Sequence, residues 1–100
     1  MELEQLRIFI AVAECGSFTR GARKLYISHS TTSRAITALE EELGARLLER
    51  GNRVLGLTPA GELLLAEARS ITAAADEAAR RVSAAGKRDT GKTGGQNDDA

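Results

Sequence analysis

The feature that most constrains the fold of this chain is a long apolar repeat in its C-terminal half. The repeat alternates spacings of four and three residues without a slip, and its members are Leu64, Ala68, Ile71, Ala75, Ala78, Val82 and Ala85. Such spacing is typical of a helix that pairs with another helix along one seam. Thr58 followed by Pro59 is a common start signal for a helix. At about 1.5 Å per residue, a helix over residues 59–85 would be roughly 40 Å long.

A helix of that length cannot be covered along its whole length by the rest of a chain of 100 residues. We therefore predict that it pairs with the same helix of a second copy, which makes the protein a homodimer. The predicted dimerisation residues are Leu64, Ala68, Ile71, Ala75, Ala78 and Val82. The alternative, in which the helix folds back on its own domain, stays open.

The N-terminal part of the chain predicts two shorter helices. The first covers residues 3–15, and its apolar residues have the spacing of one buried face, at Leu6, Phe9, Ile10 and Ala13. Gly16 suits the left-handed residue that ends a helix. Ser17 can cap a second helix over residues 18–25. The inward-facing residues of this second helix are Phe18, Ala22 and Leu25.

A tight turn at Tyr26 and Ile27 leads to a third predicted helix, over residues 29–43, which Ser28 can cap. Its buried face is predicted at Thr32, Ile36, Leu39 and Leu43. Its opposite side is polar and carries Ser30, Thr31, Ser33, Arg34 and Thr37. Gly44 closes the helix. This succession of a short helix, a tight turn and a longer helix is that of a helix-turn-helix.

The segment after this helix predicts a small hairpin. Leu47 and Leu48 indicate a short buried strand or turn, and the following residues predict two brief strands around a bend. Leu55 and Leu57 would face inward, while Arg53 lies near the tip. A two-stranded hairpin that directly follows a helix-turn-helix is a wing.

The predicted fold class is therefore mainly α, a winged helix-turn-helix with a two-stranded wing followed by a long dimerisation helix. The winged domain takes residues 1–58 and the linker or dimerisation helix takes residues 59–85. Residues 86–100 are rich in Gly and contain no apolar residue except the terminal Ala. Such a segment buries too little to order itself, which predicts a disordered tail.

The net charge of the chain is zero, but its charges are unevenly distributed. From Cys15 to Leu39 there is no acidic residue, and this stretch carries the four basic residues Arg20, Arg23, Lys24 and Arg34. The acidic residues gather elsewhere, above all in the run at 40–42. A local basic surface is thus possible on a neutral molecule. The alternative is merely an uneven solvated surface.

The composition argues against several other classes of protein. One His, one Cys and Asp residues only from position 76 onward favour neither a catalytic triad nor a metal site. The Gly-Lys-Thr sequence at 91–93 lacks the strand and helix that a phosphate-binding loop needs. We therefore expect no enzyme activity, no metal and no cofactor. Without a long apolar run or a secretion signal, and with a lone Cys15, the chain is expected to be cytoplasmic.

Three segments carry a resemblance to a known family. They are LRIFIAVAECGSFTRGARKL, SRAITALEEELGARLLER and LTPAGELLL, and they stand in the family's order within a match that covers residues 1 to about 70 without a gap. The chain in this part resembles the N-terminal domain of LysR-type transcriptional regulators. The resemblance implies a winged helix-turn-helix with a dimerising linker helix, and a bacterial regulator that binds double-stranded DNA.

The sequence departs from the family pattern in two ways. The family's recognition helix usually starts with Ser-Gln-Pro, whereas this chain has Ser28, His29 and Ser30. The base preference therefore need not be the family's usual one. The family's C-terminal effector-binding domain is also missing, so no small-molecule effector is expected to act on this chain. Whether the chain is a fragment of a longer regulator stays open.

A recognition helix enters the major groove with its N-terminus first, so its first turns must carry short polar side chains. The predicted base-contacting residues are His29, Ser30 and Thr31. The predicted phosphate-contacting residues are Ser33, Arg34, Thr37 and the wing residue Arg53. A dimer would present two such helices to an inverted repeat with half-sites about 34 Å apart, or a multiple of that distance.

A second hypothesis assigns the chain to a different class. In that interpretation the long helix pairs with a full-length relative and forms inactive mixed oligomers, with DNA binding weak or lost. The zero net charge and the altered start of the recognition helix favour this alternative modestly.

Overall fold

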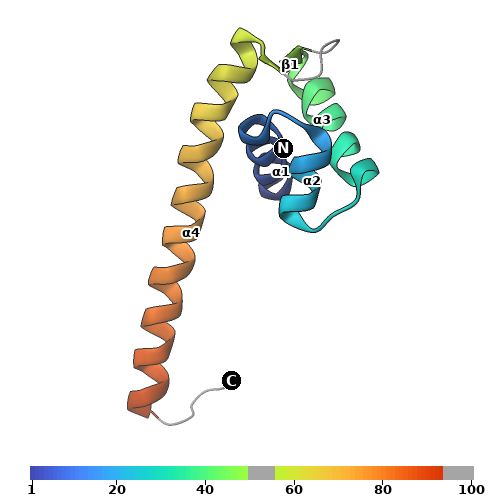
Figure 1. Cartoon of the computed structure of the whole chain (residues 1–100). Coiled ribbons are helices and arrows are strands. Elements are labelled where there is room, and N and C mark those ends of the chain that lie inside the picture. The colour runs from blue at the N-terminus through green and yellow to red at the C-terminus, as the bar shows by residue number, and fades with distance from the viewer. Residues whose placement is uncertain (50–55, 94–100) are drawn as a thin grey trace.

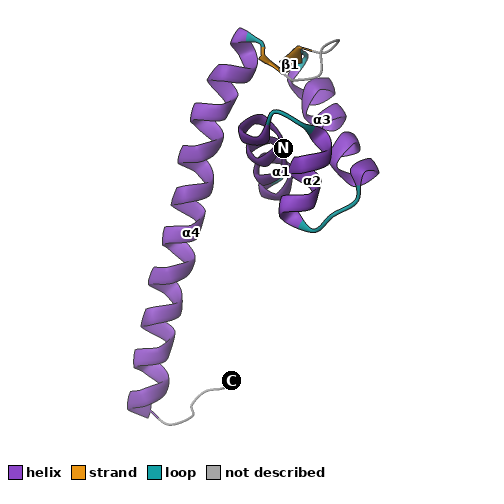
Figure 2. Cartoon of the chain, in the orientation of Figure 1, coloured by secondary structure: helices purple, strands orange, loops and turns teal. Residues whose placement is uncertain are grey.

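The computed structural model describes residues 1–49 and 56–93. Within them the elements are α1 (Leu3–Cys15), α2 (Phe18–Leu25), α3 (His29–Leu43), β1 (Leu48–Glu49), β2 (Gly56–Leu57) and α4 (Pro59–Thr93). The first three helices form a compact group, and α4 runs past this group and extends well beyond it (Figure 1). The described chain is almost entirely helical apart from one strand pair (Figure 2). The predicted fold class is confirmed.

Helix α1 lies at the centre of the compact group. It contacts α2, α3 and α4, and its largest buried side chains are Leu6, Ile8, Phe9 and Val12. The predicted buried face was too narrow, because Ile10 and Ala13 are only half-buried whereas Ile8 and Ala11 are buried. A helix that is surrounded by three others buries more than one stripe of side chains.

Helix ends follow the predicted local signals. The Ser17 and Ser28 hydroxyl oxygens accept hydrogen bonds from the backbone N–H groups of Arg20 and Thr31, at 3.1 and 3.0 Å. Gly16 and Gly44 end α1 and α3 with φ near 65°. These caps satisfy backbone groups that have no partner inside the helix, so the end of α1, the start of α2 and both ends of α3 could be predicted from single residues.

Two glycines allow backbones to approach each other closely. A Cβ atom on Gly21 would lie 2.9 Å from Cγ2 and 3.0 Å from Cα of Val12, so its absence lets α2 pack onto α1. A Cβ on Gly61 would lie 2.0 Å from the carbonyl oxygen of Leu47. Gly61 therefore lets the first turn of α4 rest directly on the backbone that leads into β1.

The base of the wing is the described part of the hairpin. Strands β1 and β2 pair antiparallel, with Leu48 opposite Leu57. Leu47 and Leu48 are buried as predicted, and Leu57 packs against the core. Arg53 and Leu55, which were assigned to the tip and to the inner face of the wing, lie outside the described residues.

Helix α4 begins as predicted, since the Thr58 hydroxyl accepts a hydrogen bond of 3.0 Å from the Gly61 N–H. It continues to Thr93, whereas the sequence predicts the end of the helix at residue 85 and a disordered tail from residue 86. Extending an existing helix adds one hydrogen bond for each residue that is fixed, and this stretch contains no Pro to stop it. Within the described residues, no helix is both long and apolar enough to cross a membrane.

The predicted inner face of α3 needs one correction. Thr32, Ile36 and Leu39 are fully buried, but Leu43 is 43% exposed. The helix ends at Leu43, where the chain turns away at Gly44, so this last position has no neighbour to cover it completely. The Thr32 hydroxyl donates a hydrogen bond of 3.0 Å to the Ser28 carbonyl oxygen, so its burial leaves that polar group satisfied.

Candidate nucleic-acid interface

The first turn of α3 is held by a small network of hydroxyl groups. The Ser28 hydroxyl accepts from the Thr31 N–H at 3.0 Å and donates to the Thr31 side-chain oxygen at 2.9 Å. Ser28 is thus a cap, as predicted. Because the Thr31 hydroxyl oxygen accepts this bond, the Thr31 hydroxyl hydrogen remains free to donate to a ligand. Its methyl group is also part of an exposed side chain.

His29, the first residue of α3, is exposed, but its side chain contacts another ring. Its ring lies against Phe18, with the ring centroids 5.8 Å apart and the planes inclined by 50°. Phe18 is itself half-buried and belongs to the first turn of α2. Phe18 therefore restricts where the imidazole can point, a role that sequence reasoning missed because it assigned Phe18 only to the inner face of α2.

One exposed stripe of α3 combines several predicted contacts. Ser30, Arg34 and Thr37 are exposed and follow one another at spacings of four and three residues, which places them on one helical face. Glu41 continues the same face toward the C-terminal end of the helix. Ser33 lies beside this stripe and is half-buried. The stripe is therefore polar and basic in its first part and acidic at its end.

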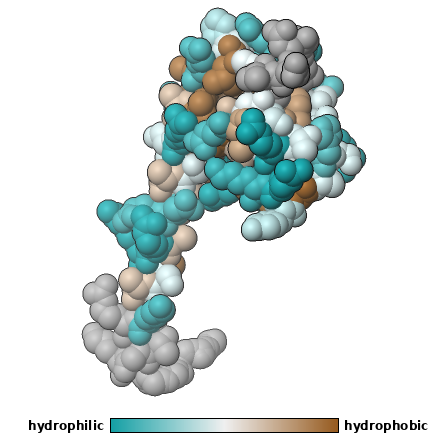
Figure 3. Space-filling model, in the orientation of Figure 1, coloured by the Kyte–Doolittle hydropathy of each residue, from teal (hydrophilic) through white to brown (hydrophobic). Residues whose placement is uncertain are grey.

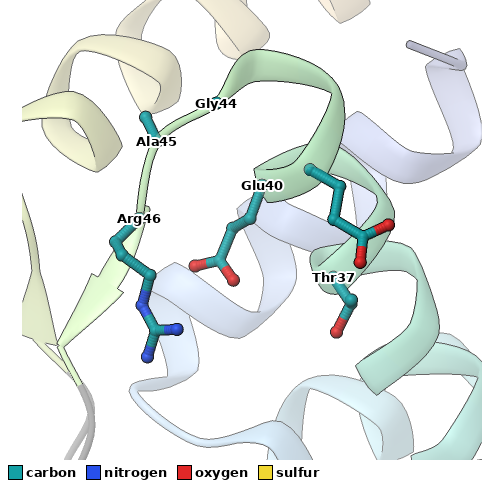
Figure 4. A pocket seen from close by; sticks show the side chains of 6 residues that line it. Thr37, Glu40, Gly44, Ala45 and Arg46 are labelled. Atoms are coloured by element: carbon teal, nitrogen blue, oxygen red, sulfur yellow. The ribbon is translucent and has the colours of Figure 1, made fainter.

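Thr37 has a less favourable setting than the other predicted phosphate contacts. It lines a shallow groove of about 390 Å³ together with Glu40, Glu41 and Arg46. In Figure 4 the side chains of Thr37, Glu40 and Arg46 extend to the same side of the last turns of α3. The Glu40 carboxylate also accepts a hydrogen bond of 2.9 Å from the Leu47 N–H, which keeps it in place. The carboxylates of Glu40 and Glu41 would repel a phosphate at Thr37, because like charges repel.

Arg46 is a candidate contact that the sequence analysis did not single out. It is exposed, follows α3 after Gly44 and faces the groove at the end of the α3 stripe. Its guanidinium could reach a phosphate that Thr37 cannot hold alone. The residue lies outside the recognition helix, so only the folding of the loop reveals its position.

The basic residues around α2 and α3 are not equivalent. Arg20, Arg23 and Arg34 are exposed, and no carboxylate in the described part of the chain forms a salt bridge with them. Lys24, by contrast, lies 3.7 Å from the Glu14 carboxylate, which also pairs with Arg69 at 3.0 Å. The predicted basic surface therefore rests on three arginines, because Glu14 partly compensates Lys24.

The predicted dimerisation residues divide into two groups along α4. Leu64 and Ala68, which were predicted to contact a second copy, belong to the buried core of their own chain, which leaves little of either side chain for such an interface. They face α1 and the wing base because α4 crosses the domain there. Farther along, Ile71, Ala78 and Val82 are exposed and Ala75 is half-buried. The available seam thus begins at Ile71.

An apolar groove lies near the start of α4. It has a volume of about 230 Å³ and is lined by Leu43, Ala45, Leu47, Ala60, Leu63, Leu64 and Glu67. Leu63 on its rim is 65% exposed. Apolar residues gather on the surface at this end of the molecule, near the top of Figure 3.

Among the described residues, no group of His, Cys, Asp and Glu side chains could hold a metal ion.

Comparisons with known proteins agree with this architecture. The model of a family described as bacterial regulatory helix-turn-helix protein, lysR family, matches residues 3–62. The regulator TfdT of Cupriavidus pinatubonensis is 41% identical over 92 residues, which cover 92% of this chain and 40% of TfdT. The uncharacterized regulator YnfL of Escherichia coli is 49% identical over 82 residues, covering 82% of this chain and 28% of YnfL. The chain thus spans less than half the length of these curated relatives.

Two solved structures extend the likeness to the fold. The BenM DNA-binding domain in complex with catB site 1 DNA matches with a TM-score of 0.81 and 43% identity, covering 83% of this chain and 92% of that chain. The complex of the CbnR DNA-binding domain with DNA matches with a TM-score of 0.81 and 43% identity, covering 86% and 99%. With a family match over more than half of its residues and this shared fold, the chain belongs to the lysR family of bacterial regulatory helix-turn-helix proteins.

Proposed function

We propose that this chain is a sequence-specific DNA-binding regulator of transcription that acts as a homodimer in the bacterial cytoplasm. The observation that carries the proposal is that the first half of α3 exposes Ser30, Thr31 and Arg34, while α2, which packs against α3, exposes Arg20 and Arg23. None of the three arginines has a carboxylate partner among the described residues. The similarity to domains that were crystallised with DNA supports it. In this proposal the first turn of α3 enters the major groove.

Each residue of the site takes a role that follows from its setting. His29, Ser30 and Thr31 read base edges, with the Thr31 hydroxyl donating to an acceptor such as a purine N7. Ser33 and Arg34 hold phosphates. Arg53 lies outside the described residues and keeps the role that the sequence predicts for it, a contact to the DNA backbone or the adjacent minor groove. Thr37 contributes to phosphate binding only together with Arg46, because Glu40 and Glu41 flank it.

The dimer forms through the part of α4 that lies beyond its own domain. Its seam consists of Ile71, Ala75, Ala78 and Val82, and it alternates spacings of four and three residues. Val82 is 72% exposed, and an exposed apolar residue that continues such a repeat has a clear partner in a second copy of the same helix. The relatives described above do not favour the alternative of an inactive mixed oligomer.

A binding experiment tests the function directly. DNA selected from random duplexes should contain an inverted repeat, and fluorescence anisotropy should show tighter binding to it than to random DNA at physiological salt. Arg34→Ala should weaken binding to both kinds of duplex and reduce the slope of log K against log salt by about one unit, as for one lost phosphate contact. Arg80→Ala is the matched control, because Arg80 is an exposed arginine on the part of α4 that extends beyond the winged domain.

A contact to a base is distinguished from a phosphate contact by its effect on sequence preference. Thr31→Ala keeps the N–H that Ser28 caps, so α3 stays intact. It should leave binding to random DNA nearly unchanged and relax the preference at one base position by roughly 1–3 kcal/mol. Equal affinity of the unmutated protein for selected and random duplexes would overturn the proposal.

A further inference from the structure

Tyr26, the residue between the two helices of the helix-turn-helix, has an unusual backbone conformation. Its φ is 59° and its ψ is 40°, which is the left-handed region, and it is the one residue other than Gly with a positive φ in the described part of the chain. The corresponding ends of α1 and α3 use Gly16 and Gly44. For a residue with a Cβ atom this conformation costs about 1–2 kcal/mol.

The fold gains little from having a tyrosine at this position. The Tyr26 side chain is 95% exposed, so its ring adds almost nothing to the core. The useful interaction is made by the backbone, since the Tyr26 N–H donates to the carbonyl oxygens of Ala22 and Arg23. A glycine would make the same hydrogen bonds without strain. The stability of the domain therefore does not account for the side chain.

The place of Tyr26 in the molecule suggests what the side chain does. Ile27 alone separates it from Ser28, the cap of α3, and Arg23 lies in the last turn of α2 just before it. With at most about 3.8 Å between consecutive Cα atoms, Tyr26 stays within roughly 11 Å of the first residue of α3. If that turn enters the major groove, the loop before it lies over the edge of the groove, where the sugar-phosphate backbone runs.

We propose that Tyr26 is a DNA-contacting residue that binds the sugar-phosphate backbone at the edge of the groove entered by α3. Its hydroxyl donates to a phosphate oxygen, and its ring packs on the neighbouring sugar. The exposed Arg23 neutralises charge on the same backbone segment. This inference rests on the proposed function. It adds an uncharged contact that fixes how deeply α3 enters the major groove.

The test measures folding and DNA binding in the same variant. Tyr26→Gly relieves the backbone strain and removes the side chain, so its melting temperature should stay equal to that of the unmutated protein or rise. Its affinity for the selected duplex should fall about tenfold, the loss expected for a hydrogen bond to a charged group. The slope of log K against log salt should not change, because Tyr26 carries no charge. Arg34→Ala must change that slope.

Tyr26→Phe separates the two parts of the contact, because it keeps the ring and loses only the hydroxyl. It should lie between the unmutated protein and Tyr26→Gly in affinity. The inference is overturned if Tyr26→Gly binds the selected duplex as tightly as the unmutated protein, or if it weakens binding only by lowering the melting temperature. Failure of the unmutated protein to prefer any duplex would instead overturn the proposed function.

Discussion

The half of α4 that lies against the winged domain (the near half) and the half that extends beyond it (the far half) have the same sequence pattern but different surroundings. In the near half, Leu64 and Ala68 are buried in the core of the winged domain, and Thr72 is buried as well. In the far half, Ala78 and Val82 occur at the same alternating spacings and are exposed. The repeat alone does not distinguish a residue that completes its own domain from one that is left for a second copy.

The difference is set by what the rest of the chain places opposite each half. Helix α1 and the backbone before β1 lie against the near half, and Gly61 makes the close approach possible. The far half leaves the domain and has no part of the compact group beside it (Figure 1). The near half is therefore part of the core, while the far half is stable as a helix only through its own hydrogen bonds or a partner.

The largest expected effect comes from adding one methyl group in the near half. Gly61→Ala would place a Cβ 2.0 Å from the Leu47 carbonyl oxygen, and neither backbone can move without disturbing the core. We expect a loss of about 3 kcal/mol in the free energy of unfolding, measured by urea denaturation. Gly86→Ala is the matched control, because its Cβ would meet nothing within 4 Å.

This pair of variants separates packing from helix propensity. Alanine favours a helix over glycine by about 1 kcal/mol, so Gly86→Ala should keep or raise the helical content seen by circular dichroism. If Gly61→Ala is as stable as the unmutated protein, the first turn of α4 does not rest on the Leu47 backbone, and the contrast between the two halves loses its structural basis.

Much of the fold was predictable because its signals are local. Ser17, Ser28 and Thr58 cap the helices that follow them, and Gly16 and Gly44 end the helices before them. Each signal acts within one helical turn, so a single sequence is enough to read it. The exposure of Ser30 and Arg34 also followed from helical periodicity alone.

The errors concern properties that depend on distant parts of the chain. Leu64 and Ile71 fit the same repeat, and only the crossing of α4 over α1 determines that the first is buried. Of the charged groups around Thr37, Glu40 and Glu41 lie within about one helical turn and follow from the spacing, whereas Arg46 is brought there by the chain after Gly44. Arg46 belongs to a different segment from α3, so no spacing rule connects the two.

The second largest effect is expected for a change in the far half of α4, which should alter dimer formation and leave the folding of the domain unchanged. Val82→Glu places a charge on the exposed seam of the far half, where it has no core to disturb. It should leave the compact domain folded but shift the protein to monomers in equilibrium sedimentation, because a charge buried at an unpaired position of a helix seam costs several kcal/mol. Ala68→Glu should instead unfold the near half, since Ala68 is fully buried.

The contrast would fail if Val82→Glu remained dimeric at micromolar concentration. The dimer would then use another surface, of which the apolar groove beside Leu43 and Leu63 is the leading candidate. A change of Leu63 to Glu, made in parallel, would distinguish the two surfaces, because Leu63 lines the groove and lies outside the seam.

The smallest effect is expected at the boundary between the halves, where ion pairs connect α4 to α1. Arg7 lies 3.3 Å from Asp76, and both side chains are substantially exposed. In a monomeric Val82→Glu background, Asp76→Asn should lower the free energy of unfolding by no more than about 1 kcal/mol, the usual value of a surface pair. The loss should shrink in high salt, which screens exposed charges. Glu77→Gln is the control, since Glu77 pairs only with Arg80 and Arg81 among the described residues and so links no part of α4 to the domain. A larger loss for Asp76→Asn that persists in high salt would mean that the domain holds α4 firmly as far as Asp76, and the boundary between the halves would move outward.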